Sequence, residues 1–278
     1  MAPSERSPFL DDITDTSFDS HLEIPTSGDP HHNATLTLSL RYKLEFADSK
    51  NRVPGVIVDI EGTARARDGK GRAQYITDWD DQSRANFTRL LWRSQKIWTY
   101  KFMLIPPRNY SGLDFKHPLP GHYVRPNVMC ALQMEPWGTP HIRITVVRAT
   151  MPSEFETSTE RAPPRNMLLD ETAARSPALG HELGHVLGMR HIKALLGDKA
   201  CIAHDNTPRC YGETALEAAN IMGTGRDLWP LNAAPWLERV ASHTQTEAGL
   251  WTATMDMKTP PETLTLAQHV LRLPTLVR

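Results

Sequence analysis

The sequence predicts an α+β fold, in which a twisted mixed β-sheet with one backing helix is followed by a second helix and an irregular C-terminal part. Three observations predict it. Apolar residues alternate with polar ones over 36–46, they recur at helical spacing over 80–98, and the stretch LGHELGHVLGMRHI follows at 179–192. Strands and one amphipathic helix thus precede a histidine-bearing helix, which is typical of an α+β domain with a cleft beneath the sheet.

The strands are predicted from alternation and from turn residues. In the first strand the apolar residues that face one way are Leu36, Leu38, Leu40, Tyr42, Leu44 and Phe46. Residues 55–62 predict a second strand, and the glycine-containing segment 64–74 predicts a turn. Three further strands are expected within 99–107, 128–137 and 141–149.

Three helices are expected. The backing helix places its apolar side at Phe87, Leu90, Leu91, Ser94 and Trp98. The histidine-bearing helix is expected to start with Ser176 as N-cap and Pro177 at its first position. Residues 234–244 predict a short third helix near the end of the chain.

Composition argues against several classes of protein. With 278 residues, 40% hydrophobic and 23% charged, the chain is ordinary globular material. A formal net charge of −1 provides no global field for nucleic acid or an anionic membrane, so neither is expected as a partner. No apolar run approaches the roughly 18 residues that span a bilayer. No basic segment followed by an apolar one marks a Sec signal peptide. We therefore expect a soluble protein.

The domain organisation is predicted from a change of composition near residue 34. Residues 1–34 are polar and rich in Asp, Ser, Thr and Pro, which predicts a flexible leader or strap. Its acidic residues leave two alternatives open, which are a prodomain that covers the cleft and a solvated tail. Residues 35–278 are predicted to form one domain, with an upper part over 35–190 and a lower part over 191–278.

Two histidines of the opening stretch are placed for metal binding. His181 and His185 are four residues apart, so on a helix both imidazoles project from one face. A catalytic zinc site needs a third protein ligand and keeps one position for water. His191 lies ten residues past His181, which is roughly 15 Å along a continuous helix. The helix must therefore end and reverse, and Gly188 accepts the left-handed conformation that ends a helix.

Glu182 follows His181 directly, so its carboxylate is expected beside the metal rather than on it. A zinc ion acidifies water and polarises a carbonyl. A neighbouring carboxylate can then take the proton from the water and return it to a leaving amine. These roles together amount to hydrolysis of a peptide bond.

The segment HELGHVLGMRH, residues 181–191, resembles the HExxHxxGxxH signature of the metzincin zinc peptidases in full. The resemblance implies Zn²⁺ as cofactor, His181, His185 and His191 as its ligands, and Glu182 as catalytic base. It also implies a methionine in a turn beneath the site, and NIMGTG places Met222 thirty-one residues after His191. In the family this methionine forms an apolar floor and binds no metal.

Two residues depart from the patterns of known metzincins. Thr224 stands where some members have a tyrosine that contacts the metal or the transition state, so any such helper must come from elsewhere. Ile192 follows the third histidine, where Ser, Asp or Glu sorts the familiar animal subfamilies. Tyr211, Arg226 and His243 remain candidates for contacts with substrate or transition state, because they follow the ligands in the part that lines the lower cleft of the family.

A second, looser resemblance concerns residues 220–240, which are similar to metallopeptidase toxin domains delivered by bacterial secretion systems. It implies a secreted or injected effector that needs no Sec signal. An inhibitor or immunity protein is then a candidate partner.

The cysteines leave alternatives open. Cys201 and Cys210 are close enough in sequence for a disulfide, but they could also be two buried thiols or form a second metal site with His204. Cys130 lies inside an apolar strand and is expected to be a core thiol.

The function that the sequence predicts is a zinc-dependent endopeptidase with an extended polypeptide substrate. We expect the substrate to pair with an edge strand such as 141–149. The alternative is a non-enzymatic protein whose zinc only stabilises the fold, with the fourth position closed by His204 or Cys201.

Overall fold

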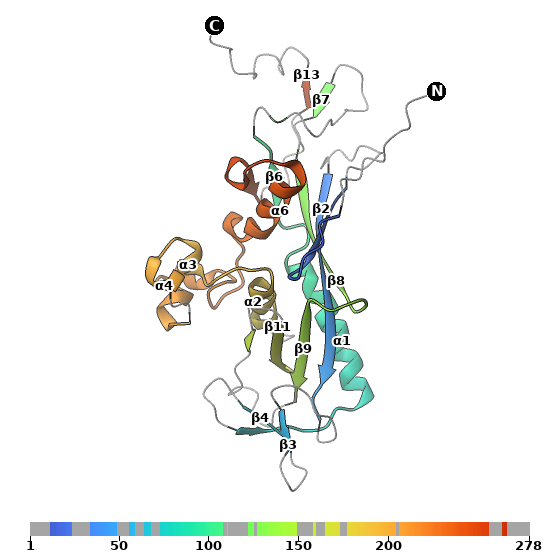
Figure 1. The fold of residues 1–278 in the computed structure, drawn as a ribbon. Coiled ribbons are helices and arrows are strands. Elements are labelled where there is room, and N and C mark those ends of the chain that lie inside the picture. The colour runs from blue at the N-terminus through green and yellow to red at the C-terminus, as the bar shows by residue number, and fades with distance from the viewer. Residues whose placement is uncertain are drawn as a thin grey trace, which may run out of the picture.

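The computed structural model describes residues 12–23, 34–48, 56–58, 64–67, 73–107, 110, 122–124, 127–148, 158–159, 165–172, 177–203, 206–255 and 263–265. Figure 1 shows a mixed sheet along the length of the molecule, with helices packed against it. The predicted α+β class is confirmed at this level.

The main sheet is mixed. Its strands run in the order β10-β11-β9-β2-β8-β6-β12, and β1 pairs with β2 off this path. The pairs β2–β8, β2–β9 and β9–β11 are parallel, and the other pairs are antiparallel. The strands are β1 (Asp19–Glu23), β2 (Ala34–Phe46), β6 (Met103–Ile105), β8 (Val128–Glu135), β9 (Ile142–Val147), β10 (Ser158–Thr159), β11 (Arg165–Asp170) and β12 (Thr252–Thr254).

Strand β2 is the central strand of this sheet. Its first part pairs with β8 and its last five residues pair with β9. Leu36, Leu38, Leu40 and Tyr42 are buried while the residues between them are more exposed, as the alternation predicts. The strands expected within 99–107, 128–137 and 141–149 are β6, β8 and β9.

Two smaller sheets lie at opposite ends of the molecule in Figure 1. One contains β3 (Val56–Val58), β4 (Ala64–Arg67) and β5 (Ala73–Tyr75), and the other pairs β7 (His122–Val124) with β13 (Thr263–Thr265). The turn predicted over 64–74 is therefore wrong in part, because both ends of that segment pair as antiparallel strands. Strand β3 lies within the strand predicted over 55–62, and the other residues of that prediction lie outside the described residues.

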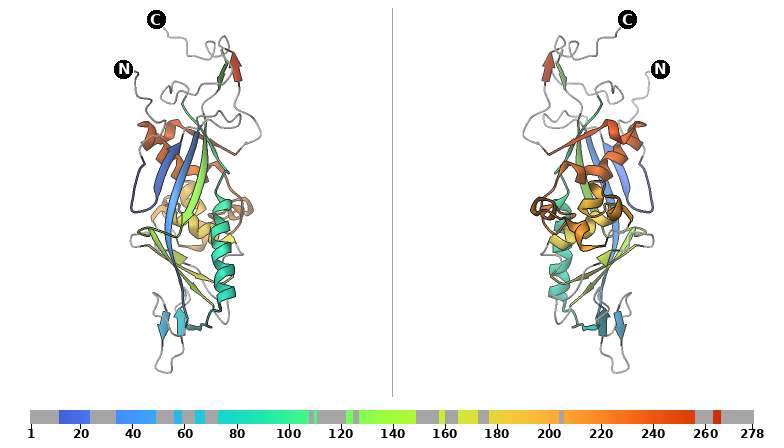
Figure 2. Two further views of the ribbon diagram at one scale, coloured as in Figure 1. Left: turned by 90° about the vertical axis from the view of Figure 1, so that its right-hand side faces the viewer. Right: turned by 90° about the vertical axis from the view of Figure 1, so that its left-hand side faces the viewer.

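The backing helix begins and ends close to the predicted bounds. Asp80 caps α1 by accepting a hydrogen bond from the Ser83 backbone at 2.7 Å, and a 3₁₀ turn, η1 (Gln95–Ile97), continues it to Trp98. Figure 2 shows α1 running lengthwise beside the sheet. The helices are α1 (Asp81–Ser94), α2 (Pro177–Val186), α3 (Ile192–Leu195), α4 (Lys199–Ala203), α5 (Ala215–Ala219) and α6 (Ala234–Thr244), with 3₁₀ helices η4 (Pro208–Tyr211), η5 (Pro230–Ala233) and η6 (Ala248–Leu250).

One hydrophobic core joins the sheet to the helices. Trp98 and Trp236 are fully buried, and their rings stack with centroids 6.4 Å apart. Both indole N–H groups are satisfied, because Trp98 donates to the Gly180 carbonyl and Trp236 to the Ala131 carbonyl. The core thus joins the end of α1, the start of α2, strand β8 and helix α6.

Part of the segment predicted as a flexible leader or strap is a strand of the sheet. Strand β1 pairs along the start of β2, and its Leu22 is fully buried. Just before β1, Ser17 accepts a hydrogen bond from the guanidinium of Arg165, which also donates to the Val186 carbonyl at the end of α2. Paired backbone and buried side chains thus hold residues 19–23 against β2, in the manner of a strap.

Two buried histidines contact residues of β1. His141 lies 3.5 Å from Asp19, and His243 lies 3.0 Å from the Ser20 hydroxyl. Burial lowers the pKa of each imidazole, and nearby arginines lower it further. The charged neighbours are Asp12, Asp19, His21, Arg41, Arg165 and Arg239.

Acidification is expected to destabilise the fold through these two groups. Since their folded pKa values lie below the ordinary value near 6.5, the unfolded chain binds more protons. Stability is then complete above about pH 6.5 and falls as the pH drops through the lowered pKa values. The unfolding temperature, measured in the presence of a chelator between about pH 8 and pH 5, tests this. In the variant His243→Gln the unfolding temperature should fall less steeply as the pH drops, and an unchanged dependence on pH would contradict the assignment.

Among the described residues, no helix has the length and apolar character needed to cross a membrane.

Candidate metal centre

Helix α2 carries the first two histidines and ends where the sequence predicts. Gly188 has a φ of +93°, its N–H bonds the His185 carbonyl, and the N–H of Met189 bonds the Gly184 carbonyl. This is the Schellman pattern that closes a helix with a left-handed residue. The chain then reverses and brings His191 back to the face of α2. Ser176, the predicted N-cap, lies outside the described residues.

The three imidazoles converge. His181, His185 and His191 each offer a ligand atom, and these atoms lie within 4.8 Å of one another. The Nε2 atoms of His185 and His191 are 3.2 Å apart. His191 is 1% exposed and His185 is 6% exposed, whereas His181 is partly buried. These residues form a group that could hold a metal ion.

Backbone carbonyls orient two of the rings. The Nδ1 atoms of His181 and His185 lie 2.8 Å from the carbonyl oxygens of Ile221 and Met189. A carbonyl can only accept, so each Nδ1 carries the proton and each Nε2 presents a lone pair toward the shared position. The second contact of each ligand therefore sets the tautomer that metal binding requires.

Met222 lies directly beneath α2. It is fully buried, and a Cβ placed on Gly184 would lie 2.3 Å from the Met222 sulfur. A larger residue at 184 would therefore force the buried Met222 side chain to shift. A Cβ on Gly180 would likewise meet the side-chain end of Ile221 at 2.9 Å. Two glycines of the motif thus have a close side-chain contact, and Gly188 has a left-handed φ.

A buried amide pair shapes the turn that carries Met222. The side-chain amide of Asn220 donates to Asn232, and its side-chain oxygen accepts from the Met222 backbone N–H at 2.8 Å. The Met222 carbonyl in turn accepts from the Ile192 N–H. This turn therefore contacts His181 through the Ile221 carbonyl, and it contacts Ile192, the residue after His191, through the Met222 carbonyl.

Glu182 is 6% exposed and directly follows His181 on α2. Its Oε2 accepts a hydrogen bond of 2.5 Å from the hydroxyl of Thr159 on β10. Sequence reasoning missed Thr159, because it lies in a polar segment without periodicity. Asn220, which precedes Met222 in a buried position, was missed as well.

The three candidates for further contacts have different surroundings. The Tyr211 ring packs on His191, with centroids 3.8 Å apart. Arg226 lines an open surface hollow with Lys96 and Lys101, and His243 bonds Ser20 beside β1. Thr224 is exposed and bonds the Ala218 carbonyl. Of these residues, the structure brings Tyr211 to the histidines.

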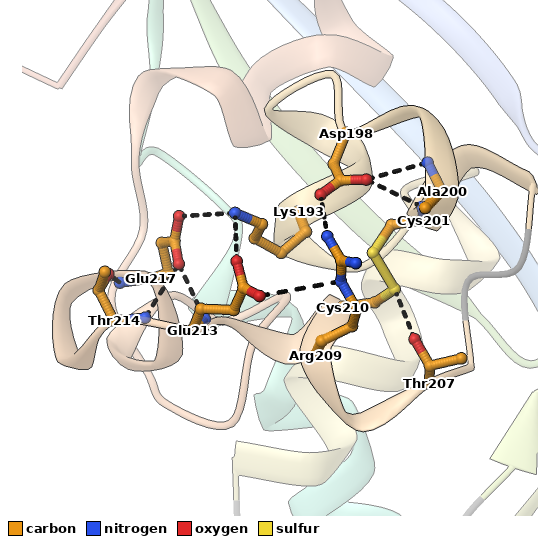
Figure 3. Close-up of polar contacts among 10 residues, drawn as sticks. All are labelled: Lys193, Asp198, Ala200, Cys201, Thr207, Arg209, Cys210, Glu213, Thr214 and Glu217. Atoms are coloured by element: carbon orange, nitrogen blue, oxygen red, sulfur yellow. Dashed lines mark hydrogen bonds and ion pairs between the residues drawn. A yellow bond between two sulfur atoms is a disulfide. The ribbon is translucent and has the colours of Figure 1, made fainter.

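Cys201 and Cys210 form a disulfide. Of the three alternatives that the sequence left open, the bond is the one present, and His204 lies outside the described residues. Figure 3 shows the bond among ionic contacts of the same segment, where Asp198 accepts from Arg209 and Lys193 contacts two glutamates. Cys130 is the expected core thiol, and burial raises its pKa well above the ordinary value.

Gly188, Gly197 and Gly249 form a matched series for testing the reversal. A Cβ would meet nothing within 4 Å at any of them, and only the first two have a left-handed φ. We expect Gly188→Ala and Gly197→Ala each to lower the free energy of unfolding by about 1–2 kcal/mol, and Gly249→Ala to change it little.

Only Gly188→Ala should also weaken metal binding, measured with Zn²⁺ as the probe, because only that turn directs His191. Denaturant unfolding and competition with a chromophoric chelator measure the two effects. Equal zinc affinity in the Gly188 and Gly197 variants would show that the turn does not control the third ligand.

Compared with family models, curated proteins and solved structures, the chain matches none of them.

Proposed function

We propose that the protein is a zinc-dependent endopeptidase of the metzincin type. The observation that carries the proposal is the convergence of His181, His185 and His191. The buried Glu182, which directly follows His181 on α2, supplies the carboxylate that the mechanism needs. The buried Met222 sulfur packs against Gly184 of α2, which supports the apolar floor that the family resemblance implies.

The donor set fits zinc. Neighbouring donors on a tetrahedral zinc ion lie roughly 3.3 Å apart, close to the 3.2 Å between the Nε2 atoms of His185 and His191. The tautomers fixed by the Ile221 and Met189 carbonyls leave two Nε2 atoms as acceptors. When bound, zinc supplies Lewis-acid chemistry that polarises a carbonyl and acidifies water.

Glu182 would move the protons. Its carboxylate would take a proton from the attacking water and deliver it to the leaving nitrogen, as a general base and then a general acid. The Thr159 hydroxyl holds one carboxylate oxygen and so limits rotation of the side chain. Thr159 is therefore a positioning residue in this scheme.

The substrate would extend along β10. The sequence-based choice of 141–149 as the edge strand is wrong, because β9 pairs with β2 on one side and β11 on the other. Strand β10 ends the sheet order and pairs with β11 alone among the described strands. It also carries Thr159 next to Glu182. A peptide added to this edge would lie across the histidine group.

A peptide library tests the proposal. The purified chain would be analysed for zinc and incubated with mixed peptides, with and without a chelator, before mass spectrometry. We expect bound zinc and new peptide termini that disappear with the chelator. Bound zinc without any cleavage, or cleavage that the chelator leaves unchanged, would contradict it.

The alternative is a zinc ion that only stabilises the fold. A structural site would need a fourth protein ligand, for which His204 and Cys201 were the candidates. The sulfur of Cys201 is in the disulfide, so Cys201 is no longer a candidate. Chelation followed by circular dichroism separates the two functions. A folded but inactive chain supports the peptidase, and unfolding on chelation supports the structural role.

Delivery as a toxin or effector, with an immunity protein as partner, is proposed on the looser resemblance alone. A peptidase with one narrow target would leave casein uncut, whereas a general peptidase would degrade it.

A further inference from the structure

We infer that Tyr211 is a positioning residue for the third ligand, and that its aromatic ring, rather than its hydroxyl, does the positioning. This inference rests on the metal site of the proposed function. The ring centroid lies 3.8 Å from that of His191 at an interplanar angle of 36°. It also lies nearly parallel to the ring of His181, at 5.8 Å and 8°. One aromatic ring thus contacts the face of one ligand and stacks over another.

The Tyr211 ring adds to the other contacts that orient the ligand rings. Carbonyl groups of the backbone orient His181 and His185 through Nδ1. His191 caps α3 from an extended conformation, with a φ of −60° and a ψ of 157°. The face of the Tyr211 ring limits rotation of the His191 imidazole about its Cβ–Cγ bond. A ligand held in this way loses less freedom when a cation binds.

The segment that carries Tyr211 is fixed by covalent and ionic links. Tyr211 ends η4 directly after Cys210, whose disulfide reaches Cys201 on α4. The Asp198 carboxylate accepts from the Arg209 guanidinium at 2.7 Å and from two backbone N–H groups of α4, as Figure 3 shows. We call residues 192–203 and 206–217 the stapled segment.

The stapled segment also includes the helix that begins after His191. Lys193 on α3 lies 3.1 Å from Glu213 and 3.4 Å from Glu217, so α3 is tied to the residues that follow Tyr211 (Figure 3). Gly212 has a φ of +122°, and a Cβ there would lie 2.5 Å from the Ala218 nitrogen. The chain therefore turns away immediately after Tyr211 and leaves the ring against the ligands.

Two substitutions separate the ring from the hydroxyl. In Tyr211→Phe the ring remains, and we expect the affinity for Zn²⁺ to stay within about twofold of the unmodified chain. In Tyr211→Leu the ring is lost, and we expect affinity to fall by about 10- to 100-fold, the range for residues that orient a ligand. Competition with a chromophoric chelator on the full chain measures both.

A matched control accounts for losses of stability. Tyr110 is a partly buried tyrosine that packs on Trp251 at 5.6 Å, away from the histidines. Tyr110→Leu removes the same groups from an aromatic pair, and we expect unchanged zinc affinity. Thermal unfolding in the presence of chelator reports the fold of each variant separately from its metal.

The disulfide supplies a second measurement. If the stapled segment acts through Tyr211, replacing Cys201 and Cys210 by serine weakens zinc binding in the same direction as Tyr211→Leu. In the Tyr211→Leu background the same replacement should then have little further effect. If the fold-losses of zinc affinity from the two changes multiply in the combined variant, the segment does not act through this ring.

The outcomes distinguish this inference from the proposed function. Equal zinc affinity in Tyr211→Leu and the unmodified chain overturns the inference alone, as does a Tyr211→Phe variant as weak as Tyr211→Leu. Tight zinc binding without peptide cleavage overturns the peptidase and leaves the test of Tyr211 valid. An unmodified chain that binds no zinc overturns both.

Discussion

Glu182→Gln is expected to bind zinc as the unmodified chain does and to lose peptide hydrolysis by about 10²- to 10⁴-fold. Glutamine has nearly the same shape, but it cannot accept the proton of the attacking water at neutral pH. The buried carboxylate of Glu182 accepts a hydrogen bond from Thr159, and the proposed donor set consists of the three histidines, so the substitution leaves that donor set unchanged. Elemental analysis and the rate of peptide cleavage measure the two quantities.

The control for this substitution is Glu171→Gln. Glu171 pairs with Arg148 at 2.9 Å, and the chemical change is the same. We expect both zinc content and cleavage to be retained there. If Glu182→Gln cleaved as fast as the unmodified chain, the assigned base would be wrong.

His185→Ala is expected to lose both zinc and hydrolysis. His185 is buried, its Nδ1 contacts the Met189 carbonyl, and its Nε2 faces that of His191. Its removal leaves two imidazoles, which is fewer than a catalytic zinc site uses. We also expect a loss of about 1–3 kcal/mol in unfolding free energy, because a buried hydrogen-bonded group is deleted.

A second buried histidine separates loss of metal from loss of stability. His243 is 9% exposed and bonds Ser20 beside β1. His243→Ala should cost a similar amount of stability and keep zinc, as shown by denaturant unfolding and metal analysis. Zinc retained at full affinity in His185→Ala would exclude His185 as a ligand.

Local sequence patterns were sufficient for elements whose burial follows their own periodicity. The alternation of Leu36, Leu38 and Leu40 predicts β2, and Phe87 and Leu91 predict the buried side of α1. The reversal at Gly188 was predicted from the ten-residue spacing of His181 and His191 and from the glycine between them, because His191 cannot return to the ligand face on a continuous helix. Each of these conclusions needs information from only a few neighbouring residues.

Other features depend on partners distant in sequence. Strand β1 has the sequence DSHLE, which contains one large apolar residue, and it is a strand because β2 pairs with it. Strand β9 appeared suitable as an edge, but its two neighbours are set by the order of the whole sheet. The contacts of Thr159 with Glu182 and of Tyr211 with His191 likewise join segments that no local pattern connects.

The contact between Gly184 and Met222 constrains how this motif can vary. Because an added methyl group at 184 would overlap the sulfur at 222, the two positions share a single volume. A larger residue at the first is expected to cost less stability when a smaller one stands at the second, and a smaller residue at the second alone leaves a void. The effect of either substitution thus depends on the other, which is epistasis arising from packing between residues 38 positions apart.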